Sequence, residues 1–163
     1  MADKSVQQQL LDIVGPLVRD ASASRKDSFM LARMAIKASQ TALAATPFAK
    51  DTDLQLALNL GQRWIDGEDV KDEIDTERLQ LELDIRKGAG KDIMLLEMIA
   101  STLHGALQMR LQNQTIDAVS GAATALGANI FSIAPTVITS YSAGETAATL
   151  NRLVAEIKDL ASQ

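Results

Sequence analysis

Apolar side chains recur along most of the chain at the three- and four-residue intervals of a helix. Residues 4–20 hold such a stripe, made by Val6, Leu10, Ile13, Val14, Leu17 and Val18, and this pattern is typical of an amphipathic helix. The Gly15-Pro16 pair predicts a kink or break within it. A second helical stretch follows Ser24 and runs through Ala44. It should end at Thr46-Pro47, because a residue before proline is pushed out of the helical region.

The middle of the chain predicts three further helices. Asp51 or Thr52 caps a helix over residues 53–66, an acidic helix runs from about Asp69 to Lys87, and Asp92 caps a helix that reaches about Gln112. Within the acidic helix, Leu and Ile alternate with polar residues over positions 79–85, which is the period of a strand. We favour a helix, because Leu, Glu and Gln are helix formers and the apolar residues of this region also fit a helical stripe.

The last third of the chain predicts two more helices around an extended connector. Thr115 opens a helix that runs to about Ile133, before Pro135. Residues 136–141 are mostly β-branched or hydroxylated, and we interpret them as extended. Ser142 and Glu145 have the spacing of a capping box, which predicts a final helix from there to Leu160.

These elements and the composition predict an all-α fold, a bundle of six or seven helices in a single domain. The expected parts are an N-terminal helical pair over residues 1–47, middle helices over 51–112 and a C-terminal part over 115–163. Aromatic residues make up only 3% of the chain, so alanine and aliphatic side chains must build a closely packed core. We expect the following residues to be largely buried: Leu10, Leu17, Met34, Leu58, Trp64, Leu96, Ile99, Leu103, Leu107, Ile130, Leu153 and Ile157.

The net charge and the cysteine content argue against several classes of function. The net charge of −5 and the absence of a basic stripe make a nucleic-acid partner a poor fit. The chain has no cysteine, which excludes disulfides, thiolate nucleophiles and Cys-ligated zinc. The first residues lack the basic flank and apolar run of a signal peptide, so a cytoplasmic location is expected.

No catalytic, metal or cofactor site is expected. His104 is the only histidine and lies beside apolar positions of its helix, which favours a boundary residue over a metal ligand. Gly88-Ala89-Gly90-Lys91 faintly resembles a phosphate loop. It lacks the earlier glycine, and Asp92 stands where Ser or Thr would bind magnesium. We interpret the segment as a turn between helices.

The acidic segment, residues 66–84, carries nine acidic and two basic side chains. Charges of one sign at this density repel one another. The segment is either a solvated face or a docking surface that attracts a basic partner; for the second interpretation the candidate residues are Asp69, Asp72, Glu73 and Asp75.

Residues 118–144 contain no charged side chain. The run is long enough to span a bilayer, but Ser, Thr, Gly, Asn and Pro135 make insertion costly. We therefore treat a membrane partner as unlikely. A core helix is the first interpretation, and a self-association surface that includes the small residues Ala123 and Gly127 is the second.

One family resemblance arises within this region. Residues 99–133 combine an Ala-rich helix, the amide cluster Gln112-Asn113-Gln114, an Ala122-Ala123-Thr124 stretch with Gly127, and a Ser132-Ile133 pair. This combination resembles the killing-trait family of R-body structural proteins. The resemblance implies a non-enzymatic subunit that polymerises into coiled ribbons. It also implies that Gln112, Asn113, Gln114, Ala123 and Gly127 lie at or near subunit contacts.

A second resemblance points to a different class of function. The segment Leu56–Glu68, with Trp64, Gly67 and Glu68 at its end, is similar to a helix end in small helical immunity proteins of bacterial toxin systems. The sequence therefore leaves two hypotheses: a structural protein that assembles with itself, or a binding module that masks a basic partner through its acidic segment. It names no small-molecule substrate.

Overall fold

Polar side chains cap most of the helices and so set where they begin. The computed structural model describes residues 5–88, 92–111, 115–141 and 144–163. The side chains of Ser5, Ser24, Asp51, Asp92 and Thr115 each accept a hydrogen bond from a backbone N–H of the following first turn. Such caps satisfy backbone donors that have no partner within the helix. The helices are α1 (Val6–Asp20), α2 (Arg25–Ala44), α3 (Thr52–Ile65), α4 (Lys71–Lys87), α5 (Ile93–Arg110), α6 (Ile116–Thr124), the π-helical η1 (Ala125–Asn129), α7 (Ile130–Tyr141) and α8 (Thr146–Ala161).

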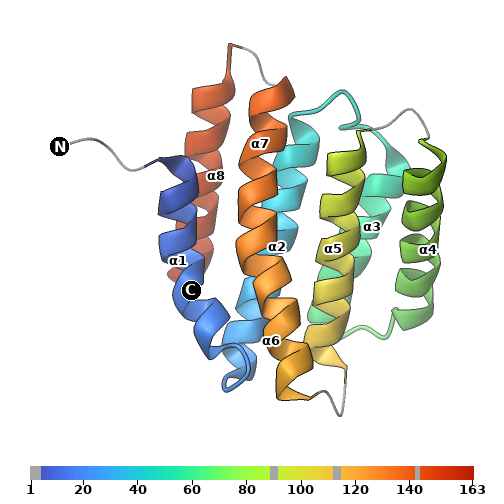
Figure 1. The fold of residues 1–163 in the computed structure, drawn as a ribbon, viewed down its shortest axis with the longest axis vertical. Helices are drawn as coiled ribbons and strands as arrows, with labels where there is room; N and C mark the ends of the chain where they lie inside the picture. Colours follow the sequence, from blue (N-terminus) through green and yellow to red (C-terminus); the bar gives the residue numbers. More distant parts are fainter. Residues whose placement is uncertain (1–4, 89–91, 112–114, 142–143) are drawn as a thin grey trace.

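The helices pack in two layers (Figure 1). α6, η1 and α7 follow one another without a break, so the described ranges hold seven helices and contain no strand. One layer contains α1, the continuous α6–η1–α7 helix, α5 and α4, and the other contains α8, α2 and α3. α4 packs on α3 and α5, and α8 packs on α1, α2 and α7. These two helices therefore lie at opposite edges of the bundle.

α2 and α5 form the centre of the bundle, and small residues let them approach closely. Ala32, Ala35 and Ala38 of α2 are fully buried. At the crossing, the hydroxyls of Ser39 and Thr102 lie 3.0 Å apart. Thr102 already donates its hydroxyl hydrogen to the carbonyl of Met98 at 2.8 Å, so Ser39 must be the donor to Thr102. These two hydrogen bonds satisfy both buried hydroxyls, as burial in an apolar core requires.

The predicted fold class is confirmed, and so is the helix over residues 79–85. All of the predicted core residues are buried except Leu17, which is half-buried against the core. Of the kink or break expected at Gly15-Pro16, the break is not present, because α1 continues through Pro16 to Asp20.

The extended connector predicted over residues 136–141 is wrong. These residues belong to α7, which contains Pro135 inside the helix. Val137 and Ile138 are buried, and α7 packs on α2. Burial of the β-branched side chains therefore outweighs their weak helix propensity. Ser142 of the predicted capping box lies outside the described residues; α8 begins after Glu145, whose side chain makes no capping hydrogen bond.

Candidate functional site

The small residues of the α6–η1–α7 helix serve contacts within the chain. Ala123 is fully buried, and Gly127 is buried too. A methyl group added at Gly127 would lie 2.2 Å from the Cγ2 atom of Val18 on α1. The sequence correctly marked a position of close approach, but the neighbour is α1 of the same chain. Both residues are thus used in packing within the chain. The other predicted contact residues, Gln112, Asn113 and Gln114, lie outside the described residues.

The outward side of the same helix is free of charge beyond Asp117. We call it the hydroxyl face; its exposed residues are Ser120, Gly121, Thr124, Ala128, Asn129, Thr136, Thr139 and Ser140. Thr124, Thr136, Thr139 and Ser140 each donate a hydrogen bond to the carbonyl four residues earlier, over 2.8–3.1 Å. Half-buried Ser132 does the same at 2.9 Å and accepts a bond from Gln7 of α1. The hydroxyl hydrogens of these five residues are therefore already bonded to the helix itself.

The charge-free helix also meets a simple length and composition test for membrane spans. Asp117–Tyr141 has 25 residues and a mean hydropathy of 1.4 over its most apolar window. In the folded protein 56% of that window is buried inside the bundle. A core helix meets the same criteria, so this observation is weak support for a membrane partner, which we do not propose.

The acidic candidates lie at the edge of the bundle, in the turn from α3 to α4 and in the first turns of α4. Asp69, Asp72 and Glu73 are exposed and form no ion pair with other described residues. Asp75 differs, because Lys71 lies 2.8 Å and Arg78 3.8 Å from its carboxylate. Asp72 and Glu73 also lie at a helix N-terminus, where negative charge is stabilised. Local repulsion is thus partly relieved within α4.

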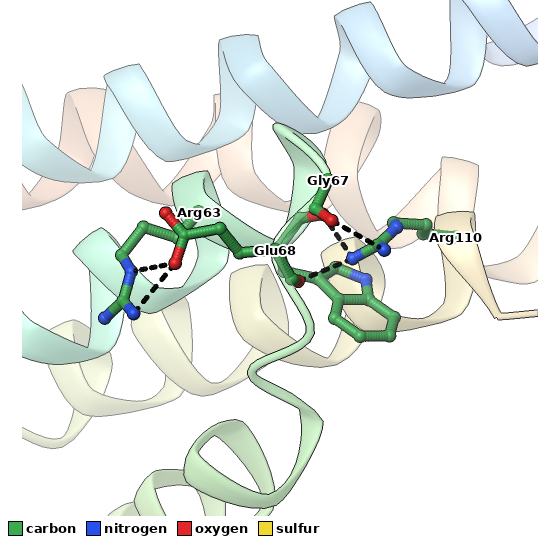
Figure 2. Close-up of polar contacts among 5 residues, drawn as sticks. Arg63, Gly67, Glu68 and Arg110 are labelled. Carbon is green, nitrogen blue, oxygen red and sulfur yellow. Dashed lines mark hydrogen bonds and ion pairs between the residues drawn. The ribbon is translucent and has the colours of Figure 1, made fainter.

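Trp64 and Arg110 hold the start of the acidic segment in place. The guanidinium of Arg110 donates hydrogen bonds to the carbonyls of Trp64, Gly67 and Glu68 over 2.7–3.0 Å, and so caps the end of α3 (Figure 2). It also lies 4.2 Å from the centre of the Trp64 ring. The indole N–H donates to the carbonyl of Ala106 on α5 at 3.1 Å.

An exposed ion pair lies at the same turn. Arg63 and Glu68 lie 2.9 Å apart, and Glu68 raises the pKa of Arg63 through the hydrogen bond and its charge (Figure 2). Together these contacts make the α3–α4 turn a defined surface. Sequence reasoning did not identify Arg110, because its partners are more than 40 residues earlier in the chain.

His104 lies on the exposed side of α5, opposite Arg78 and Glu82 of α4. Partial burial and the positive charge of Arg78 lower its pKa, while Glu82 opposes them. No group of three or more His, Cys, Asp or Glu side chains suited to a metal ion is present among the described residues. Within the ranges that the structure describes, no hydrogen bond joins His104 to a carboxylate or a hydroxyl, as a catalytic set requires.

A groove of about 1130 Å³ opens between the α1–α2 turn, the end of α5 and α6. Phe29, Trp64, Met109 and Val119 give it apolar walls. Three of its polar side chains are used in local contacts: Ser24 caps α2, Ser28 donates to the carbonyl of Arg25, and Arg25 lies over the Phe29 ring. Asp69 and Gln108 also line the groove.

Comparisons with protein-family models, with curated proteins and with solved structures found no match to this chain. The resemblances to R-body subunits and to immunity proteins therefore remain predictions from the sequence.

Proposed function

We propose that this protein is a non-enzymatic helical subunit that associates with copies of itself, and that the hydroxyl face is the contact surface. The observation that carries the proposal is the absence of charge on the exposed residues of this face, in a chain that is 23% charged. The resemblance to R-body structural proteins points to the same class of function.

Removing water from the hydroxyl face costs little free energy, for three reasons. It has no charge to desolvate, and four of its exposed hydroxyls already donate to backbone carbonyls. Its side chains are short and lose little rotamer entropy when they become ordered. Small residues also let two helices approach closely, which increases the dispersion contacts between them.

The test is a charge placed on the exposed side, where it leaves the core intact. Thr136→Arg should reduce particle size in sedimentation and light-scattering measurements while helicity is unchanged. Asn59→Arg is the matched control, because Asn59 is also exposed, uncharged and helical, but lies on α3. If the two substitutions reduced particle size equally, or if Thr136→Arg had no effect on it, the hydroxyl face would not be the contact surface.

A second function, the masking of a basic partner, is favoured by the exposed and unpaired carboxylates of Asp69, Asp72 and Glu73. Carboxylates arranged in this way would speed the encounter with a basic protein. Masking predicts a monomer or dimer of fixed size at all concentrations, whereas assembly predicts growing or heterogeneous particles. The same sedimentation experiment therefore separates the two functions.

A further inference from the structure

The outward side of α4 carries an apolar residue with opposite charges at equal distances on either side. Leu79 is the most exposed large hydrophobic residue described, at 59%. Asp72 lies seven residues before it and Arg86 seven residues after it, and both are exposed. Residues seven apart lie on nearly the same line along a helix. We call these three residues the α4 stripe.

No part of the described protein covers this stripe. α4 turns its buried residues, Ile74 and Leu81, toward the bundle. Asp72 and Arg86 make no ion pair with other described residues, and half-exposed Leu83, one turn beyond Leu79, lies outside the core. α4 stands at the edge of the molecule with its outer side open (Figure 1).

From this arrangement we infer that α4 pairs antiparallel with α4 of a second copy of this chain. Turning one stripe end over end brings Leu79 onto Leu79 of the second copy, on a two-fold axis. Asp72 of each copy then faces Arg86 of the other. A parallel pairing would instead oppose Asp72 to Asp72 and Arg86 to Arg86, which is repulsive. The charges of the α4 stripe are therefore complementary to themselves in the antiparallel orientation and not in the parallel one, as a two-fold interface between these three residues requires.

The inference adds a second contact surface to the proposed self-association. It rests on the proposed function in one respect: both contacts join copies of one chain. A single helix pair is smaller than a standard interface of about 1,600 Å², so the contact is weak. We expect dimers at protein concentrations on the order of 100 µM and above. They should weaken as salt is raised, because exposed ion pairs are screened.

Charge reversal on the full chain tests the pairing by sedimentation equilibrium. Asp72→Arg and Arg86→Asp should each raise the dissociation constant about tenfold or more, because each puts like charges opposite one another at both ends of the contact. The two substitutions change the net charge in opposite directions, so a general charge effect cannot produce both losses. An equimolar mixture of the two variants should dimerise again, since every opposed pair in the mixed dimer is then acid with base.

Matched controls lie on other helices. Asp159→Arg and Lys158→Asp make the same changes of net charge on α8, at the opposite edge, and should leave the dissociation constant within about twofold. Leu79→Gln should weaken the dimer, and Leu56→Gln on α3, where the leucine is 41% exposed, should not. Circular dichroism of each variant checks the helical content.

All of these measurements use Thr136→Arg as the parent protein, so that association through the hydroxyl face does not contribute. A parent that remains monomeric at millimolar concentration overturns the α4 pairing and leaves the hydroxyl face untouched. Single reversals that dimerise like their parent, or a mixture that stays monomeric, overturn it as well. The effect of Thr136→Arg on the association of the otherwise unaltered chain is measured separately, and it tests only the proposed function.

Discussion

Arg110 shows how one side chain can fix a turn that joins two helices. It satisfies three carbonyls at the end of α3 and packs on the Trp64 ring. We predict that Arg110→Met lowers the free energy of unfolding by about 1–3 kcal/mol, the range for hydrogen bonds to a charged group. Urea unfolding measures this change. Arg63→Met is the control, because it removes only an exposed ion pair and should have little effect; equal losses would show that Arg110 does not fix the turn.

His104 offers a direct measurement of electrostatics between α4 and α5, because it is the only histidine. Partial burial and Arg78 lower its pKa, so its proton NMR titration should have a midpoint below the ordinary value. Arg78→Gln should raise that midpoint, and Glu82→Gln should lower it further. Opposite shifts would mean that the two side chains do not face His104.

The lowered pKa of His104 also fixes the sign of its effect on stability. The unfolded chain binds the proton more readily than the folded one, so this residue's contribution is present above the unfolded pKa and lost as the pH falls below it. His104→Gln should therefore make unfolding less sensitive to pH in mildly acidic solution, as followed by urea unfolding at several pH values. The effect is small, because His104 is largely exposed.

At the residue scale, the sequence predicted which side chains are buried but not which residues they contact. The helical stripe of Leu96, Ile99 and Leu103 identified core positions, because periodicity reports which side faces the protein. It could not assign Gly127 to Val18, since the two lie more than 100 residues apart. The same limit applies to Ala123, which is buried within the bundle: a small residue indicates close approach but does not identify the neighbour.

At the element scale, the glycines of the α6–η1–α7 helix have different roles. Gly127→Ala should destabilise the fold by about 1–3 kcal/mol, because the new methyl group would overlap Val18. Gly121→Ala in the same helix meets open space and should stabilise it by about 0.5–1 kcal/mol. Thermal unfolding measures both. Val18→Ala in the Gly127→Ala background should recover part of the loss; no recovery would mean that Val18 does not determine it.

The helix over residues 136–141 marks the limit of sequence reasoning about elements. Pro135 and the β-branched residues after it argue against a helix when considered locally. The structure keeps the helix, because burying Val137 and Ile138 against the bundle offsets those local costs. The alternation over residues 79–85 shows the converse, since Leu79 and Leu83 point outward and only Leu81 is buried. An apolar pattern alone does not say which leucines the fold leaves exposed.

At the scale of the whole molecule, the two proposed contacts lie on different parts of the bundle. α4 stands at one edge, and α5 separates it from the α6–η1–α7 helix (Figure 1). Two distinct faces that each join like to like link copies into an extended chain, whereas one such face stops at a dimer. Thr136→Arg and Asp72→Arg should therefore each limit particles to about dimer size, and the double variant should be monomeric. Growth that persists in the double variant would require a contact elsewhere.

Sedimentation equilibrium of the unaltered chain over a wide concentration range tests the central claim, self-association, most directly. Association through the hydroxyl face and α4 predicts that the average mass rises continuously with protein concentration. At a fixed protein concentration the average mass should fall as salt is added, because salt weakens the Asp72–Arg86 pairs. A mass that stays at one monomer from micromolar to millimolar concentration would contradict the account.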